Sequence, residues 1–325
     1  MAQKDLTSKV LESEPDVFAD IFNTLLFSLE NEKIVNSEDN LIDEPTEGIY
    51  RDYSGNLRNM FKDISKEYHR DDAQSYLACF NIENEATVKR TIPLKCLGYK
   101  YATLKRQQDL YENKRKALNE LKNKAKEEGN TEKYELFDNE LKNIGKFHTV
   151  PFISIVLNFD DKAWDEPTNL ADLNIESIYN KYDEPFRIKV FNVKSFDKEL
   201  RSKFTSDFRI FVEMFCTNDL PDELKDVSLK HPTELIDMVV AFTKNKKLED
   251  IRNRIAVDEL EGKTMSMGTI FDNVAYKEVI AAAITNKTLG MDDQKIIQFL
   301  MIRLETTWEK ATEIFEKEVL IPASA

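Results

Sequence analysis

The segment Ser75-Tyr-Leu-Ala-Cys-Phe-Asn-Ile-Glu-Asn-Glu85 is apolar over its first half and ends in alternating acids. Its aromatic and aliphatic residues predict a β-strand. Because side chains along a strand alternate between the two faces of a sheet, Glu83 and Glu85 are expected to project from the same face at its carboxyl end. This segment therefore predicts a core strand that ends in a pair of carboxylates.

The sequence that follows this strand predicts a parallel partner for it. A segment dense in Lys, Glu and Leu, about 94–143, is predicted to be helical, with a break at Glu128-Gly-Asn130. It leads to Val150-Pro-Phe-Ile-Ser-Ile-Val-Leu-Asn-Phe159, a β-rich run with few polar residues, as expected of a strand covered on both faces. A long helix between two strands indicates a crossover connection, so 75–85 and 150–159 are expected to pair in parallel.

The remaining segments complete a predicted mixed sheet flanked by helices. Residues 16–27 carry a helical apolar face, residues 31–47 are predicted to be loop, and residues 186–193 alternate as a strand does. A short strand over 49–53 is expected to be the antiparallel neighbour of 75–85.

After about Phe196 no strand is predicted, and residues 197–318 are predicted to form several helices. We therefore expect an α/β fold in which helices flank a central mixed sheet and the C-terminal half is mostly helical. The expected domains are residues 1–195, which contain the sheet, and residues 196–325, a helical region.

Composition restricts the class of protein. With 41% hydrophobic and 10% aromatic residues in 325, the chain has a globular composition. Its first residues lack the apolar stretch of a signal peptide, and no segment approaches ~18 uninterrupted apolar residues, so no membrane span is expected. Three widely spaced cysteines argue against a disulfide framework and a zinc cluster. A reducing compartment is indicated, and the cytoplasm is the expected location.

The formal net charge of −14 opposes a simple nucleic-acid-binding interpretation. Surfaces that bind nucleic acids are usually basic, because counterion release from the phosphates supplies much of the affinity. Any such surface must be local here, and a metal ion held by carboxylates could reverse the sign of the charge at the site itself.

A third acid is expected beside the two glutamates. If the strand at 49–53 pairs with 75–85, Asp52 lies near Glu83 and Glu85 at one edge of the sheet. Hard cations such as Mg²⁺ bind a few carboxylates and keep several waters, which suits phosphate chemistry. The alternative interpretation is that these are three solvated acids in a chain that has 60 of them.

Short stretches in a consistent order between residues 4 and 195 carry a further signal. They are Lys4-Asp-Leu-Thr-Ser-Lys-Val10, Phe18-Ala-Asp-Ile-Phe-Asn23, Glu44-Pro-Thr-Glu47, Tyr50-Arg-Asp52, Asn81-Ile-Glu-Asn84, Ile92-Pro-Leu-Lys95, Val150-Pro-Phe-Ile153, and Trp164 with its flanking acids. In this order they resemble the Rpn group of recombination-promoting, transposase-like nucleases, within the PD-(D/E)xK nuclease superfamily. The resemblance implies an α+β core of nuclease type and fades through the helical C-terminal half.

The resemblance implies roles for individual residues. Asp52 matches the first metal-binding aspartate of the family, and Glu83 matches the glutamate of its Glu-x-Gln motif. The main-chain carbonyl of Asn84 is implied as a further ligand. Asp20, on the first helix, is a candidate to bind a second metal or to support the first. The implied activity is DNA hydrolysis assisted by Mg²⁺ or Mn²⁺.

Two positions depart from the family pattern. Glu85 stands where the family usually has Gln and the superfamily Lys, and Lys95 stands where family members commonly have Arg. Glu85 could be a second metal ligand, a general base, or the mark of a decayed site, because a carboxylate can only accept protons or bind metal. Lys95 is the candidate to neutralise phosphate charge.

Two hypotheses from different classes follow. The first is a divalent-metal-dependent DNA endonuclease, linked to recombination or mobile elements by the resemblance alone. The second is a catalytically inactive nuclease-fold protein that binds another protein through its acidic surface or helical half, which the net charge and Glu85 favour. A homodimer is left open.

Overall fold

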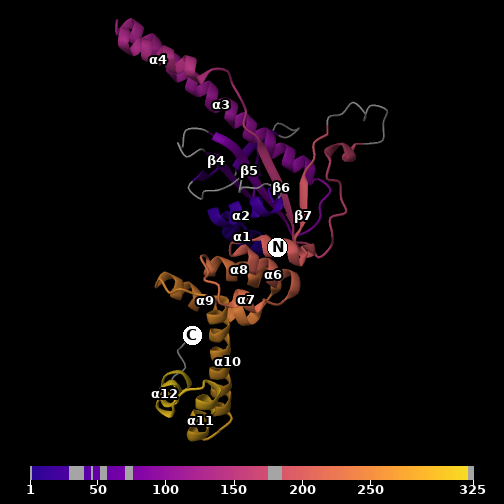
Figure 1. The fold of residues 1–325 in the computed structure, drawn as a ribbon, viewed down its shortest axis with the longest axis vertical. Helices are drawn as coiled ribbons and strands as arrows, with labels where there is room; N and C mark the ends of the chain where they lie inside the picture. Colours follow the sequence, from indigo (N-terminus) through magenta and orange to yellow (C-terminus); the bar gives the residue numbers. More distant parts are fainter. Residues whose placement is uncertain are drawn as a thin grey trace. The chain divides into compact units, whose positions relative to one another are not determined.

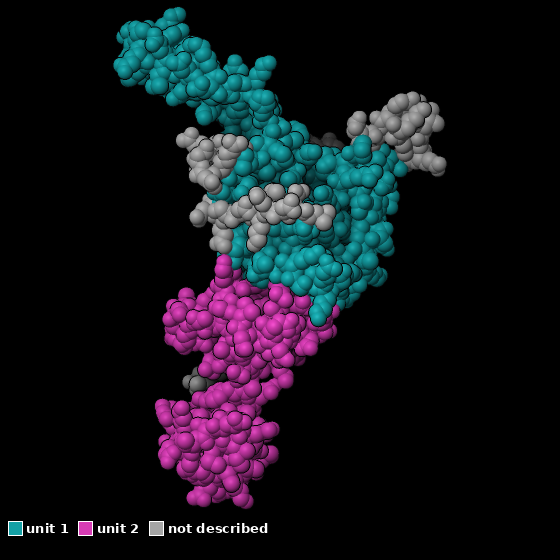
Figure 2. Space-filling model, in the orientation of Figure 1, with its two compact units in different colours: residues 1–206 teal, residues 207–325 magenta. Residues whose placement is uncertain are grey.

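The protein combines a mixed β-sheet with a largely helical second half, which confirms the expected α+β class (Figure 1). The computed structural model describes residues 2–28, 40–44, 47–51, 57–69, 76–174 and 185–320. The chain forms two compact units, Met1–Ser206 and Asp207–Ala325 (Figure 2).

The sheet of the first unit has the strand order β1-β4-β5-β6-β7. Its strands are β1 (Leu41–Asp43), β4 (Ile64–His69), β5 (Tyr76–Glu85), β6 (Phe152–Asn158) and β7 (Lys189–Asn192). The pairs β1–β4 and β4–β5 are antiparallel, whereas β5–β6 and β6–β7 are parallel. The predicted parallel pairing of the two long apolar strands is thus confirmed.

Two sets of helices cover opposite faces of β5. On one face Phe80 packs on Phe22 of α2 (Pro15–Leu25), with ring centroids 4.8 Å apart, and Asn84 contacts α1 (Ala2–Ser13). Residues of the other parity, such as Glu83, contact α3 (Ile92–Glu127). Because both faces are covered, residues 78–83 and 85 of β5 are buried, including both glutamates.

The predicted helical segment after β5 is confirmed as two helices, α3 and α4 (Thr131–Ile144). They are separated at Gly129, whose φ of +65° is a conformation that favours glycine. The first half of α3 lies on the sheet, and its second half projects beyond the sheet together with α4 (Figure 1).

The expected pairing of the strand at 49–53 with β5 is wrong. That segment contributes to β2 (Glu47–Arg51), which pairs with β3 (Leu57–Phe61) in a two-stranded sheet of its own. The antiparallel neighbour of β5 is β4, which the sequence analysis does not predict. The segment 31–47, predicted to be loop, contains β1; its residues 31–39, 45 and 46 lie outside the described residues.

Beyond the sheet, the described residues after Phe196 contain helices and no strand, as predicted. The helices are α5 (Lys198–Lys203), α6 (Phe208–Thr217), α7 (Asp222–Lys225), α8 (Pro232–Thr243), α9 (Lys246–Leu260), α10 (Met267–Thr288), α11 (Asp293–Arg303) and α12 (Trp308–Ile314). Within the described part of the chain, no helix has the length and apolar character that a membrane span requires.

Candidate functional site

Glu83 and Glu85 lie at the carboxyl end of β5, on one face, as the strand periodicity predicts. Glu83 is fully buried and Glu85 is 2% exposed. Both contact the ammonium group of Lys95: Glu83 Oε1 directly, and Glu85 Oε1 at 3.5 Å. Glu85 Oε2 also pairs with Lys89 Nζ at 2.6 Å. The structure therefore brings together three of the predicted site residues, with the two glutamates around the Lys95 ammonium group.

The start of α3 positions Lys95. Pro93 occupies the first turn of the helix, where its missing N–H costs no hydrogen bond and its fixed φ suits the helix. Lys95, in the same turn, extends to the end of β5. A cation at a helix N-terminus is disfavoured by the helix dipole, whereas carboxylates there are favoured. Glu83 and Glu85 therefore compensate a lysine that the helix alone would disfavour.

Asp63 is the acid that comes just before β4, at the end of the sheet where Glu83 lies. The β4–β5 register ends with Ile64 paired to Ile82, and Asp63 and Glu83 are the next residues beyond that pair. Its Oδ2 accepts the backbone N–H of Asn84 at 2.8 Å, and its Oδ1 pairs with Lys9 Nζ at 2.7 Å. Sequence reasoning missed this residue because it missed β4.

The sequence did contain a signal for Asp63. Antiparallel neighbours are usually joined by short connections, and Lys62-Asp63 lies nearer in the chain to β5 than Arg51-Asp52 does. Asp52 itself lies outside the described residues. Its predicted role as a metal ligand remains a prediction, but the strand pairing on which that prediction rested is wrong.

Asn84 points to the face opposite Glu83. Its side-chain Nδ2 donates to Ser8 Oγ at 3.2 Å and to Glu12 Oε2, both on α1. Its backbone N–H holds Asp63. Asn84 thus links α1 to the strand end, while the role predicted for its main-chain carbonyl remains a prediction.

Asp20 lies in α2 and is 8% exposed. Its Oδ2 accepts the backbone N–H groups of Thr205 and Ser206, each at 2.8 Å, and the Ser206 hydroxyl at 2.7 Å. Its Oδ1 accepts from the Thr205 hydroxyl at 3.1 Å. These contacts tie the end of the first unit to α2, and the predicted metal-binding role of Asp20 remains a prediction.

Charge at the strand end is balanced. The carboxylates of Asp63, Glu83 and Glu85 lie against the ammonium groups of Lys9, Lys89 and Lys95. Glu83 Oε2 is buried and has no hydrogen-bond partner among the described residues. A buried acceptor without a partner costs about 1–3 kcal/mol, so this oxygen is a place where the fold is not optimised for stability.

A hard cation such as Mg²⁺ requires several oxygen ligands at once. All three acids offer oxygen donors, the type that Mg²⁺ and Mn²⁺ prefer, and Glu83 Oε2 is an available one. In their present positions, however, no three acidic, histidine or cysteine side chains of the described residues form a metal-holding group. The donor chemistry fits a metal, but the side chains are arranged around lysines.

Another buried carboxylate, Glu44, lies on the same side of β5 as Glu83 and contacts α3. Its Oε2 accepts from Ser65 at 2.5 Å, Cys79 at 2.7 Å and Lys62 at 2.7 Å. Its Oε1 accepts from Thr103 of α3 at 3.0 Å. Burial raises the pKa of Glu44, but the Lys62 ammonium and the hydrogen bonds from Cys79, Lys62 and Ser65 outweigh it, so the pKa is lowered overall.

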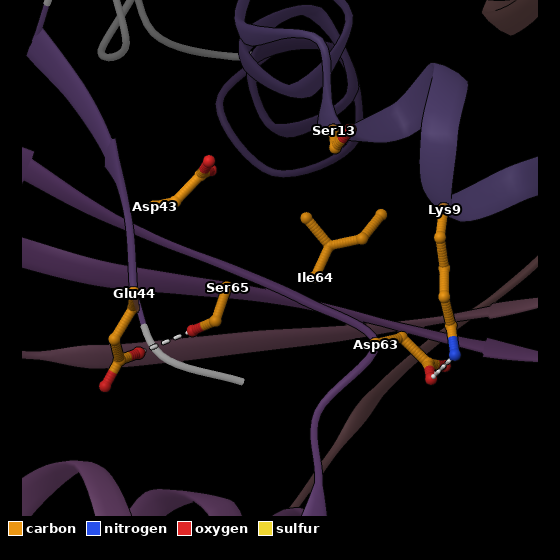
Figure 3. A pocket seen from close by; sticks show the side chains of 7 residues that line it. All are labelled: Lys9, Ser13, Asp43, Glu44, Asp63, Ile64 and Ser65. Carbon is orange, nitrogen blue, oxygen red and sulfur yellow. Dashed lines mark hydrogen bonds and ion pairs between the residues drawn. The ribbon is translucent and has the colours of Figure 1, made fainter. Parts of the chain in front are cut away.

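A hollow of about 460 Å³ is lined by Lys9, Ser13, Asp43, Glu44, Asp63, Ile64 and Ser65. Figure 3 shows the Lys9–Asp63 pair on one wall and Glu44 with Ser65 on another, with Ile64 between them. Asp63 therefore both lines this hollow and contacts the end of β5 through the backbone N–H of Asn84.

Comparison of the chain with protein-family models, with curated proteins and with solved structures gives no match. The resemblance described above therefore rests on the quoted residues alone.

Proposed function

We propose that this protein hydrolyses phosphodiester bonds in DNA with the help of a divalent cation, at the carboxyl end of β5. The observation that carries the proposal is Glu83 Oε2, a fully buried carboxylate oxygen without a hydrogen-bond partner among the described residues. It lies on the same face of β5 as Glu85, and Asp63 comes just before β4 at the same end of the sheet. A buried acceptor oxygen without a hydrogen bond is uncommon in folded proteins and calls for an explanation, of which a functional role is one.

Each residue has a distinct part in the proposed chemistry. A bound Mg²⁺ or Mn²⁺ would supply an activated water and stabilise the charge that develops on the phosphate. Glu83 and Asp63 are the proposed ligands, and Glu85 is a further ligand or a base. Lys95 has a side chain that is 38% exposed, so its ammonium can leave the glutamates and meet a phosphate oxygen.

Before any metal binds, the acids of the proposed site are paired with lysines. With Lys95 held by Glu83 and Glu85, and Lys9 by Asp63, the acids are neutralised before any cation binds. A divalent cation must displace at least one ammonium group from them. Metal binding is therefore expected to move Lys95 toward solvent, where substrate phosphate would lie.

The test is cleavage of supercoiled plasmid with Mg²⁺ or Mn²⁺ by wild type and matched variants. Glu83→Gln and Asp63→Asn are expected to lower the rate on the order of 100-fold or more, since each removes a charge that stabilises the reaction. Glu313→Gln, on an exposed position of α12, is the control and should cleave as wild type does.

Asp52→Asn, measured in parallel, decides which aspartate belongs to the site. Loss of activity in Asp63→Asn with activity retained in Asp52→Asn supports the ladder geometry, and the reverse result supports the resemblance. Intact plasmid with the folded wild-type protein in both metals contradicts the proposed activity.

A second candidate function is supported by the lysine pairing itself. Asp63, Glu83 and Glu85 each have a cationic partner, as in a cluster of charges that only stabilises the fold. Position 85 also carries a glutamate where the family that the chain resembles usually has Gln. On this view the protein is an inactive nuclease-fold module that binds a protein partner. Partner binding that survives Glu83→Gln, together with no cleavage by wild type, would favour it.

A further inference from the structure

The projecting part of the first unit is a two-helix arm, defined here as residues 108–127 of α3 together with α4. Few of its side chains are buried: Leu118 and Ala125 on α3 fall below 9% exposure, and no residue of α4 does. The helices are joined by Lys122, which pairs with Asp138 at 2.6 Å and lies over the Tyr134 ring at 5.0 Å. Because so few side chains are buried between the two helices, their contact buries little apolar surface, and the arm leaves apolar side chains exposed.

One exposed flank of α3, about a quarter turn from the side that faces α4, carries a basic, apolar stripe. Leu110 and Leu121 are 54% and 45% exposed, and Ala117 between them is exposed as well. At about 100° per residue these three positions fall within about 40° of one another on the helix. Lys114 and Lys124 border the same line. We call this set the basic stripe.

The outer face of α4 carries the opposite charge. Tyr134 and Asp138 face α3, so Leu136, two residues from each, points away from it. Leu136 is 54% exposed and is flanked one turn away on each side by Glu132 and Glu140, both exposed. We call these three residues the acidic stripe.

We infer that the arm is a self-association surface on which a second copy of this chain docks, the basic stripe of one copy against the acidic stripe of the other. Each stripe has exposed leucine; Lys114 and Lys124 flank the leucines of the basic stripe, and Glu132 and Glu140 flank Leu136 of the acidic stripe. Over the whole arm, residues 108–127 contain six Lys or Arg and four Asp or Glu, whereas α4 contains two and four. Two arms side by side bury their leucines as the helices of a four-helix bundle do.

The identity of the occupant follows from charge complementarity. The acidic stripe disfavours a nucleic acid on α4, and the basic stripe alone would not explain the exposed Leu136. A second copy supplies both stripes at once. The inference does not depend on the proposed hydrolytic activity, because the arm residues are separate from Glu83 and Lys95.

The experiment measures the mass of the full-length chain in solution by light scattering over a concentration series. We expect a species of at least twice the 37.8 kDa chain mass, which weakens as salt screens the charges. The double variant Leu110→Glu/Leu121→Glu should raise the dissociation constant at least about 10-fold, because it sets acids against acids. Adding Leu136→Lys to Leu121→Glu should restore part of the affinity.

Matched controls are Leu260→Glu and Leu289→Glu in the second unit, at positions 88% and 79% exposed, which should associate as wild type does. Far-UV circular dichroism verifies that every variant keeps its helices. A monomeric wild type overturns the inference, as does association that the arm variants leave unchanged. A monomer whose retention on duplex DNA is lost in Lys114→Glu/Lys124→Glu overturns it in favour of a nucleic-acid contact.

Discussion

Two buried carboxylates on the same side of β5, Glu44 and Glu83, have opposite surroundings. Glu44 accepts from four donors, one of them the ammonium of Lys62, whose side chain is only 4% exposed. Glu83 contacts one donor, Lys95, whose side chain is 38% exposed, and one of its oxygens has no partner among the described residues. Removing one partner of a saturated buried ion pair destabilises the fold, whereas a buried oxygen without a hydrogen bond carries a cost that a ligand can remove.

The largest expected effect comes from Glu44→Gln. The change removes the charge that balances Lys62 and leaves an ammonium group buried without its counter-ion. Breaking one partner of a buried pair costs about 3–5 kcal/mol, so the free energy of unfolding should fall by that amount. Urea denaturation followed by circular dichroism measures it, and a loss below about 1 kcal/mol would show that Glu44 is not the stabilising member of the comparison.

Glu83→Gln is the matched substitution on the same side of the strand. Lys95 keeps Glu85 as a partner and can reach water, so no cation is left buried and unpaired. The free energy of unfolding should change by less than about 1 kcal/mol, or rise, as is common when a functional charge is removed. The same denaturation experiment measures it, and a loss equal to that of Glu44→Gln would remove the distinction between the two sites.

The pH dependence of stability sharpens the comparison further. The pKa of Glu44 is lowered below its ordinary value of 4.5 in the folded state. Its contribution to stability is therefore complete above pH 4.5 and is lost as the pH falls through the lower folded-state pKa. The difference in unfolding free energy between wild type and Glu44→Gln should shrink with acidification below pH 4.5. A difference that is constant from pH 7 to pH 3 would contradict the assignment.

The smallest expected effect concerns Cys79, which donates to Glu44, and Cys96 on α3. Burial raises the pKa of each thiol to about 12, and the Glu44 carboxylate adds to the rise at Cys79. Both are therefore neutral thiols at pH 8 and should resist alkylation until the protein unfolds. Cys216, which is partly exposed, should react first. Mass spectrometry after iodoacetamide treatment gives the sites, and rapid labelling of Cys79 in the native protein would contradict the burial of the Glu44 cluster.

The predictable parts of this fold are those whose signal is local. The strands β5 and β6 are long and apolar, and the helix between them requires a crossover, so their parallel pairing follows from the sequence. The shared face of Glu83 and Glu85 can also be predicted, because side chains two residues apart on a strand point to the same side of the sheet.

Strand β4 could not be predicted because its signal is tertiary. Its sequence, Ile64-Ser-Lys-Glu-Tyr-His69, is mostly polar. Lys66 is nevertheless buried: its ammonium nitrogen lies over the Phe18 ring, 5.7 Å from the ring centroid, and pairs with Asp43. Because β4 was not predicted, Asp63 could not be assigned to the end of the sheet where Glu83 lies. The segment 49–53 was predicted in place of β4 as the antiparallel neighbour of β5.

The most direct measurement of the central proposal is anomalous diffraction from crystals of the protein soaked in Mn²⁺. We predict a manganese peak within coordination distance of Glu83 and Asp63, with the Lys95 ammonium displaced from Glu83, and no such peak in Glu83→Gln. A Mn²⁺-saturated crystal in which Lys95 still contacts both Glu83 and Glu85, and in which no manganese lies at the end of β5, would contradict it.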